Sequence, residues 1–139
     1  MSKYTVVYRD EGVFVDRDAW WFKVAVIKDR DSRIGACADT GHWVRSNLKP
    51  VECLRILKGR IVSSHLKDLN QMGPSAHDVP YGLGVSDVAG ILDELKAQGF
   101  AGNLSIEYEY HWENSSPEIA ESVKFFNSVC AGLATETKN

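Results

Sequence analysis

Residues 34–43 of this chain read IGACADTGHW, a short apolar run that ends in an acidic side chain. Two later stretches repeat this arrangement, RIVSSHLKD at 60–68 and NLSIEYEYHW at 103–112. The polar residues that close the three runs are Asp39, His65 and Glu107. A loop and a helix-like segment follow each run, so strands and helices alternate along the chain. This alternation predicts a parallel sheet with right-handed crossovers.

The three closing residues define a candidate metal site. In parallel α/β sheets the chemistry gathers at the carboxyl ends of the strands, which is where Asp39, His65 and Glu107 fall. Two carboxylates and one imidazole suit a hard or borderline divalent cation such as Mn, Zn or Mg. The alternative interpretation is a set of hydrogen-bonded polar residues at strand ends, which are polar in any case.

The sequence predicts one domain over residues 1–139, built from four β/α units without a linker. The first unit, residues 1–30, is the most divergent: a strand is expected at 4–8 and a helix at about 18–28, although AWWFKVAVI in that segment could also form a strand. The polar tail at 134–139 is expected to fray.

The other three units have clearer boundaries. Their strands are expected at 34–39, 61–65 and 104–109. Their helices are expected to begin at Pro50, at Ser86 or Asp87, and near Pro117, with Gly59 and Gly99 as stop signals. The last helix is expected to bury a face made of Ile119, Val123, Phe126 and Cys130. The long loop at 69–85 is a candidate active-site loop, because loops of this length are functional or mobile.

Length, charge and cysteine content limit the classes of protein. With 139 residues the chain can supply about half of an eight-fold β/α barrel, which typically needs about 250 residues. A net charge of -3 without a basic stripe argues against nucleic acid as a partner. The sequence has no signal-type apolar stretch and no membrane-spanning run, so we expect a cytoplasmic, soluble protein. We expect Cys37, Cys53 and Cys130 to be reduced and at least two of them buried.

Four motifs carry a resemblance to a known family: CADTGHWVRS, GRIVSSHLKD, HDVPYGLG and LSIEYEY. From residue 34 to the end of the last helix, the chain resembles the C-terminal half of the xylose-isomerase-like TIM-barrel superfamily, which includes sugar and sugar-phosphate isomerases and epimerases. The resemblance implies a (β/α)4 half-barrel with outer helices. It also implies that Asp39, His65 and Glu107 bind a divalent metal.

Further roles follow from the same resemblance. Glu107 is expected to be both a ligand and the catalytic base, while His42, Lys67 and His77 are expected to bind substrate. Glu109 lies two residues beyond Glu107 on the same strand face, so either glutamate could point at the ion. From the residues alone, Lys67 and Asp68 are better explained as an ion pair.

The chain departs from the family pattern near its start. Family members carry four more β/α units upstream and a further metal ligand at the end of the fifth strand. The corresponding segment here reads YTVVYRDEG, which places Tyr8 or Arg9 at the ligand position. Asp10 or Glu11 could substitute if the loop bends inward, whereas an arginine would place a fixed positive charge at the site.

A half-barrel also predicts a partner. Four parallel strands leave two open edges and one uncovered apolar face, so we expect a homodimer in which each first strand pairs with the other chain's last strand. A swapped or face-to-face dimer is the alternative. The function that the family resemblance implies is that of a metal-dependent sugar isomerase or epimerase acting on a small sugar or sugar phosphate. The alternative is a non-catalytic, self-assembling half-barrel that binds a metal or a small carbohydrate.

Overall fold

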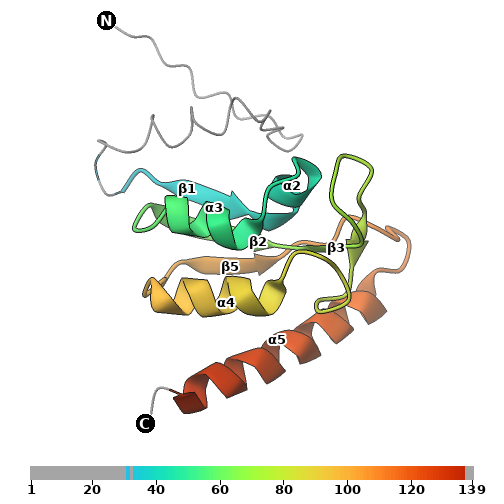
Figure 1. The fold of residues 1–139 in the computed structure, drawn as a ribbon. Helices are drawn as coiled ribbons and strands as arrows, with labels where there is room; N and C mark the ends of the chain where they lie inside the picture. Colours follow the sequence, from blue (N-terminus) through green and yellow to red (C-terminus); the bar gives the residue numbers. More distant parts are fainter. Residues whose placement is uncertain (1–30, 32, 137–139) are drawn as a thin grey trace, which may run out of the picture.

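The computed structural model describes residue 31 and residues 33–136 (Figure 1). The expected first β/α unit therefore lies outside the described residues. The same holds for the candidate ligand positions at Tyr8, Arg9, Asp10 and Glu11. The described part of the fold begins at the second expected unit.

Three parallel strands form the central sheet, in the order β1-β2-β5. Their bounds are β1 (Ala36–Asp39), β2 (Ile61–Leu66) and β5 (Asn103–Ile106). Asp39 is in register with His65, and His65 is in register with Ser105, so the three carboxyl ends meet at one rim. The predicted parallel α/β architecture, a part of a TIM barrel, is confirmed.

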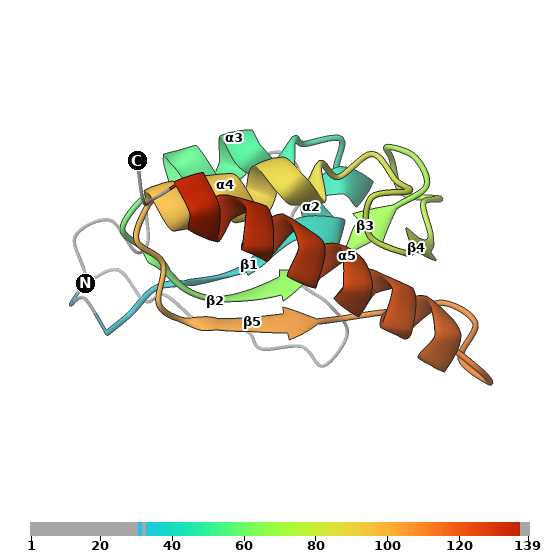
Figure 2. The same ribbon diagram turned by 90° about the horizontal axis from the view of Figure 1, so that it is seen from below.

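The helices lie mainly on one face of this sheet, where α3, α4 and α5 form a layer in the side view (Figure 2). The helices in the described part of the chain are α2 (Thr40–Arg45), α3 (Pro50–Ile56), α4 (Val88–Ala97) and α5 (Ser116–Glu136). Pro50 occupies the first turn of α3, where its missing N–H costs no helical hydrogen bond. Asp87 caps α4 by accepting a hydrogen bond from the backbone N–H of Gly90. The short helix α2 was not predicted.

The core fills the space between the sheet and the helices. Its fully buried members come from every layer: Ala38, Leu54, Leu66 and Ile91 have no exposed surface. Burying a leucine or isoleucine side chain contributes about 1.5–3 kcal/mol to the stability of the fold, so this core holds the sheet and the helices together.

The opposite face of the sheet has no described element over it (Figure 2). Cys37 is exposed on β1, and Val62 on β2 is 44% exposed. Cys37 is flanked by Ala36 and Ala38, which pack on the helical side, so strand alternation turns its thiol to the other face. The expectation of at least two buried cysteines is therefore wrong: only Cys53 is buried, and burial raises the pKa of its thiol to about 12.

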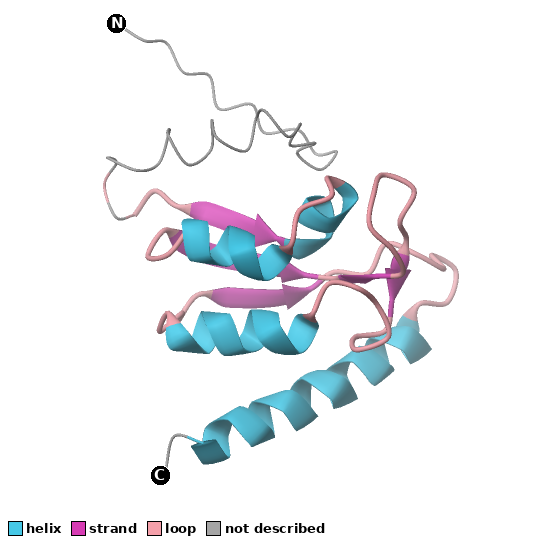
Figure 3. Cartoon of the chain, in the orientation of Figure 1, coloured by secondary structure: helices cyan, strands magenta, loops and turns pink. Residues whose placement is uncertain are grey.

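The segment between β2 and α4 is more ordered than the sequence suggested. It contains a two-stranded antiparallel sheet, which was not predicted, made of β3 (Asp68–Leu69) and β4 (Asp78–Val79) (Figure 3). The buried Asp68 carboxylate accepts hydrogen bonds from the backbone N–H groups of Gly82, Gly84 and Ser86 at 2.9–3.0 Å. The loop is thereby fastened to the end of β2.

The last helix differs from its expected form in two ways. It continues through Glu136, so the polar tail expected to fray from residue 134 begins as helix. Val123 is 38% exposed instead of buried. The face of α5 that packs on the core consists of Phe125, Phe126, Val129, Cys130 and Leu133. None of the described helices is long and apolar enough to span a membrane.

Candidate metal centre

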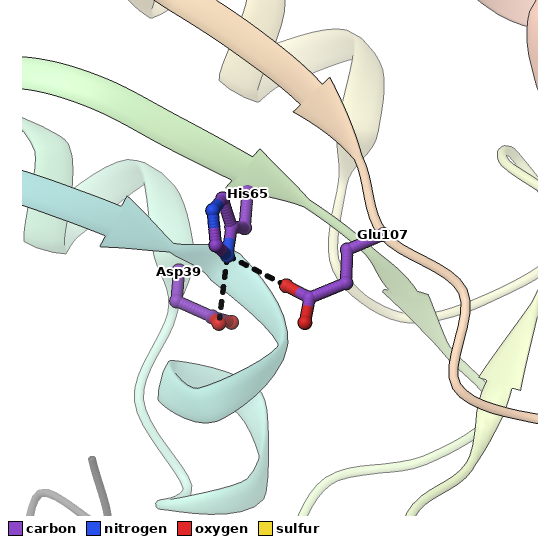
Figure 4. Close-up of side chains that lie close together, drawn as sticks. All are labelled: Asp39, His65 and Glu107. Carbon is purple, nitrogen blue, oxygen red and sulfur yellow. Dashed lines mark ion pairs between the residues drawn. The ribbon is translucent and has the colours of Figure 1, made fainter. Parts of the chain in front are cut away.

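Asp39, His65 and Glu107 converge at the rim of the sheet (Figure 4). Each offers one ligand atom, and these atoms lie within 4.8 Å of one another. The Nδ1 atom of His65 lies 2.7 Å from Glu107 Oε2 and 3.8 Å from Asp39 Oδ2. The convergence follows from the register, since Asp39 and His65 are cross-strand neighbours, and the N–H of Glu107 donates to Leu66 O just beyond β5.

The β1–α2 turn fixes the position of Asp39. Its Oδ1 atom accepts a hydrogen bond from the backbone N–H of His42 at 3.0 Å and so caps α2, which leaves Oδ2 toward the site. The Thr40 hydroxyl accepts a hydrogen bond from the backbone N–H of Lys67 at 2.8 Å, which ties the start of α2 to the end of β2.

Glu107 Oε2 is buried and accepts no hydrogen bond from any described residue. His65 Nδ1 at 2.7 Å and Lys67 Nζ at 3.3 Å are within ion-pair distance, but neither contact has hydrogen-bond geometry. A buried acceptor left without a hydrogen bond costs about 1–3 kcal/mol. A cation at the cluster would satisfy it. The donor set, two carboxylate oxygens and an imidazole nitrogen, fits a divalent metal ion.

Two other predicted site residues lie at different distances from the cluster. His42 is near it, with Nε2 3.5 Å from Asp39 Oδ2. His77 stacks on Tyr110, with ring centroids 4.3 Å apart. Among the described residues, His77 has no contact with any of the three candidate ligands. Substrate binding by His42 and His77 remains a prediction.

Lys67 has different charged partners from the one expected. Its side chain is fully buried, and substrate binding by Lys67 remains a prediction. Lys67 does not pair with Asp68, whose carboxylate accepts hydrogen bonds from backbone N–H groups instead. The Lys67 ammonium contacts the carboxylates of Glu109 and Glu107. Burial acts to lower the pKa of Lys67, but the charges of Asp39, Glu109 and Glu107 outweigh this and raise it.

The structure separates the two glutamates that the sequence left as alternatives. Glu107 joins the candidate ligands, whereas Glu109 contacts Lys67 and lies 3.5 Å from the guanidinium of Arg45. Burial acts to raise the pKa of Glu109, but the hydrogen bond and charge of Lys67, with the charge of Arg45, hold it below its usual range.

Two members of this charged network, Arg45 and Asp78, were not predicted from the sequence. Asp78 Oδ2 accepts hydrogen bonds from Arg45 Nη2 at 3.2 Å and from the backbone N–H of Glu109 at 3.3 Å. Asp78 is buried, and burial is the main cause of its raised pKa. Arg45 and Asp78 lie within the quoted motifs CADTGHWVRS and HDVPYGLG, but nothing in the spacing of these motifs indicates that the two meet.

Parallel strands with outer helices, and an Asp-His-Glu cluster at their carboxyl rim, define a partial β/α barrel with a candidate metal centre. The chain belongs to the xylose isomerase-like TIM barrel family, whose family model matches residues 18–129.

Solved structures agree with the fold. A xylose isomerase domain protein from Planctomyces limnophilus matches with a TM-score of 0.74 and 19% identity, over 86% of this chain and 46% of that one. A D-tagatose 3-epimerase-like protein matches with a TM-score of 0.66 and 21% identity, over 82% and 41%. An uncharacterised protein from Parabacteroides distasonis matches with a TM-score of 0.52 and 34% identity, over 80% and 45%.

The chain thus spans less than half the length of each of these three structures. No curated protein matches the sequence.

Proposed function

We propose that Asp39, His65 and Glu107 bind a divalent cation, and that this centre serves the isomerisation or epimerisation of a small sugar or sugar phosphate. The observation that carries the proposal is Glu107 Oε2, a buried acceptor without a hydrogen bond that faces the other two candidate ligands. The family and the names of two similar structures, a xylose isomerase domain protein and a D-tagatose 3-epimerase-like protein, support the substrate class.

Each residue of the site has its own part in the proposed reaction. A bound divalent cation would supply Lewis acidity toward a substrate carbonyl and hydroxyl. Asp39, His65 and Glu107 would hold it, and the Glu107 carboxylate is also the candidate base for moving a proton on the adjacent carbon. His42, whose Nε2 atom lies 3.5 Å from Asp39 Oδ2, would orient a substrate hydroxyl.

Turnover of a panel of aldoses, ketoses and their phosphates tests this function. The metal-free chain is supplied with Mn²⁺, Zn²⁺ or Mg²⁺, and products are separated by chromatography. We expect isomerisation or epimerisation that stops with chelator and falls at least about 100-fold in Glu107→Gln, because the variant loses both a ligand and the base. Parent-like activity in Glu107→Gln would contradict the assignment of Glu107.

The second candidate function is a non-catalytic half-barrel that binds a metal or a small carbohydrate. It is favoured by one observation: the chain covers 41–46% of each of these three similar structures, so the match extends over only part of each of them. Metal binding without turnover of any substrate in the panel would select this candidate.

We also propose a second copy of the chain as the partner that covers the open sheet face. Exposed apolar side chains such as Val62 lie on the strands, and an open sheet face is costly in water. Light scattering is expected to give twice the 15.5 kDa mass of one chain. Val62→Asp should shift the protein toward the monomer, while Val123→Asp, at an exposed valine of α5, should leave the mass unchanged. A stable monomer at micromolar concentration would overturn this partner.

A further inference from the structure

Lys67 is a fully buried lysine that immediately follows β2, next to the candidate metal centre. Its aliphatic stem packs against the start of α2: a Cβ atom added at Gly41 would come within 2.5 Å of Lys67 Cδ. Its backbone N–H is held by the hydroxyl of Thr40 at 2.8 Å. Gly41 therefore leaves room for the aliphatic stem of Lys67, and the packing of this stem fixes the position of the ammonium.

The charges around this ammonium form matched pairs. The Lys67 ammonium donates a hydrogen bond to Glu109 Oε2, and Arg45 lies 3.2 Å from Asp78 Oδ2. Arg45 Nη1 also lies 3.5 Å from Glu109 Oε2, so Glu109 sits between two cations. Lys67 balances Glu109 and Arg45 balances Asp78. The carboxylates of the metal cluster are left with two negative charges, which match a divalent cation.

Glu107 lies next to these paired charges. Its Oε2 atom lies 3.3 Å from Lys67 Nζ, yet the contact lacks hydrogen-bond geometry. The ammonium is thus directed at Glu109 and only lies alongside Glu107. Without the charge on Glu109, the ammonium would have Glu107 as its nearest carboxylate and would compete with a cation for it.

We propose that Lys67 and Glu109 are positioning residues: they form a buried, charge-neutral pair that supports Glu107 while leaving its carboxylate available to the metal. The inference rests on the proposed metal binding and assigns to this pair the control of metal affinity. It predicts that the two members of the pair influence affinity in opposite directions.

Isothermal titration of the full chain with Mn²⁺ alone tests the pair. We expect Glu109→Gln to weaken binding about tenfold or more, because the unpaired ammonium takes Glu107. We expect Lys67→Met to tighten binding about tenfold, because Glu109 then keeps only its contact with Arg45 and the region beside the cation has one positive charge fewer. The double variant removes both charges and should bind within about threefold of the parent. Arg55→Met and Glu94→Gln, which break an exposed ion pair elsewhere, serve as controls and should bind like the parent.

The outcomes separate this proposal from the metal site itself. A parent chain that binds no Mn²⁺ overturns the metal centre and this proposal with it. A parent that binds while all variants bind equally overturns only the positioning role. Weaker binding in both single variants would indicate a merely structural pair and also overturns it. If Lys67→Met does not fold, Glu109→Gln decides: weaker binding with an unchanged melting temperature in chelator supports the proposal, and parent-like binding rejects it.

Discussion

Manganese added to the metal-free chain is expected to raise its melting temperature by about 8 °C when the free cation is about a hundredfold above its Kd. Only the folded chain brings Asp39, His65 and Glu107 within 4.8 Å of one another, so the cation binds the folded state and stabilises it by mass action. At this ratio the gain is about 2.7 kcal/mol. Chelator should reverse the shift. Differential scanning calorimetry with Mn²⁺, Zn²⁺ and Mg²⁺ measures it.

Two variants make this experiment specific. His65→Ala removes the imidazole and should abolish the shift while leaving the association state unchanged, because His65 lies at the rim with 44% of its side chain exposed. His111→Ala, which removes an exposed histidine paired with Glu118, should respond like the parent. A melting temperature that ignores both cation and chelator, or an equal response in His65→Ala, would rule out this metal centre.

Asp68→Ala is expected to lower the free energy of unfolding by about 3–5 kcal/mol, because it leaves three backbone N–H groups of the ordered loop without their charged acceptor. In Asp68→Asn one oxygen can still accept from Gly82 and Gly84, which share Oδ2, while Ser86 loses its acceptor. That variant should fall between Asp68→Ala and the parent. Urea unfolding followed by circular dichroism measures all three.

Asp93→Ala is the matched control, since Asp93 is an exposed aspartate on α4 and its loss should change stability by less than about 0.5 kcal/mol. If Asp68→Ala unfolds within about 1 kcal/mol of the parent, the loop is held by contacts other than this carboxylate.

The strands and the candidate ligands were predictable because they depend on local patterns. An apolar run followed by a polar residue marks a strand end, and the parallel arrangement brings strand ends together without any knowledge of side-chain packing. The choice between Glu107 and Glu109 was not predictable in this way. Strand alternation puts both on one face, but β5 ends at Ile106. The N–H of Glu107 still bonds the neighbouring strand at Leu66, whereas that of Glu109 bonds Asp78.

The misassigned pair of Lys67 and Asp68 has a physical explanation. Neighbours along an extended chain point to opposite sides, so their charges are poorly placed to meet. Their actual partners lie far along the sequence: Glu109 is 42 residues from Lys67, and Gly82, Gly84 and Ser86 are 14 to 18 residues from Asp68. Contacts of this range depend on the path of the loop, which carries no periodic signal in the sequence.

Asp39 gives one oxygen to the first turn of α2 and turns the other toward the candidate metal. Because α2 forms when the domain folds, the Asp39 side chain is already held in position when a cation binds. Part of the entropic cost of assembling the metal centre therefore belongs to folding and not to metal binding. The two roles of Asp39 together restrict which side chains this position can accept. Aspartate is a preferred N-cap residue, and a longer acid could keep the charge of the ligand but not the geometry of the cap. The cap of α2 and the geometry of this ligand thus depend on the same side chain.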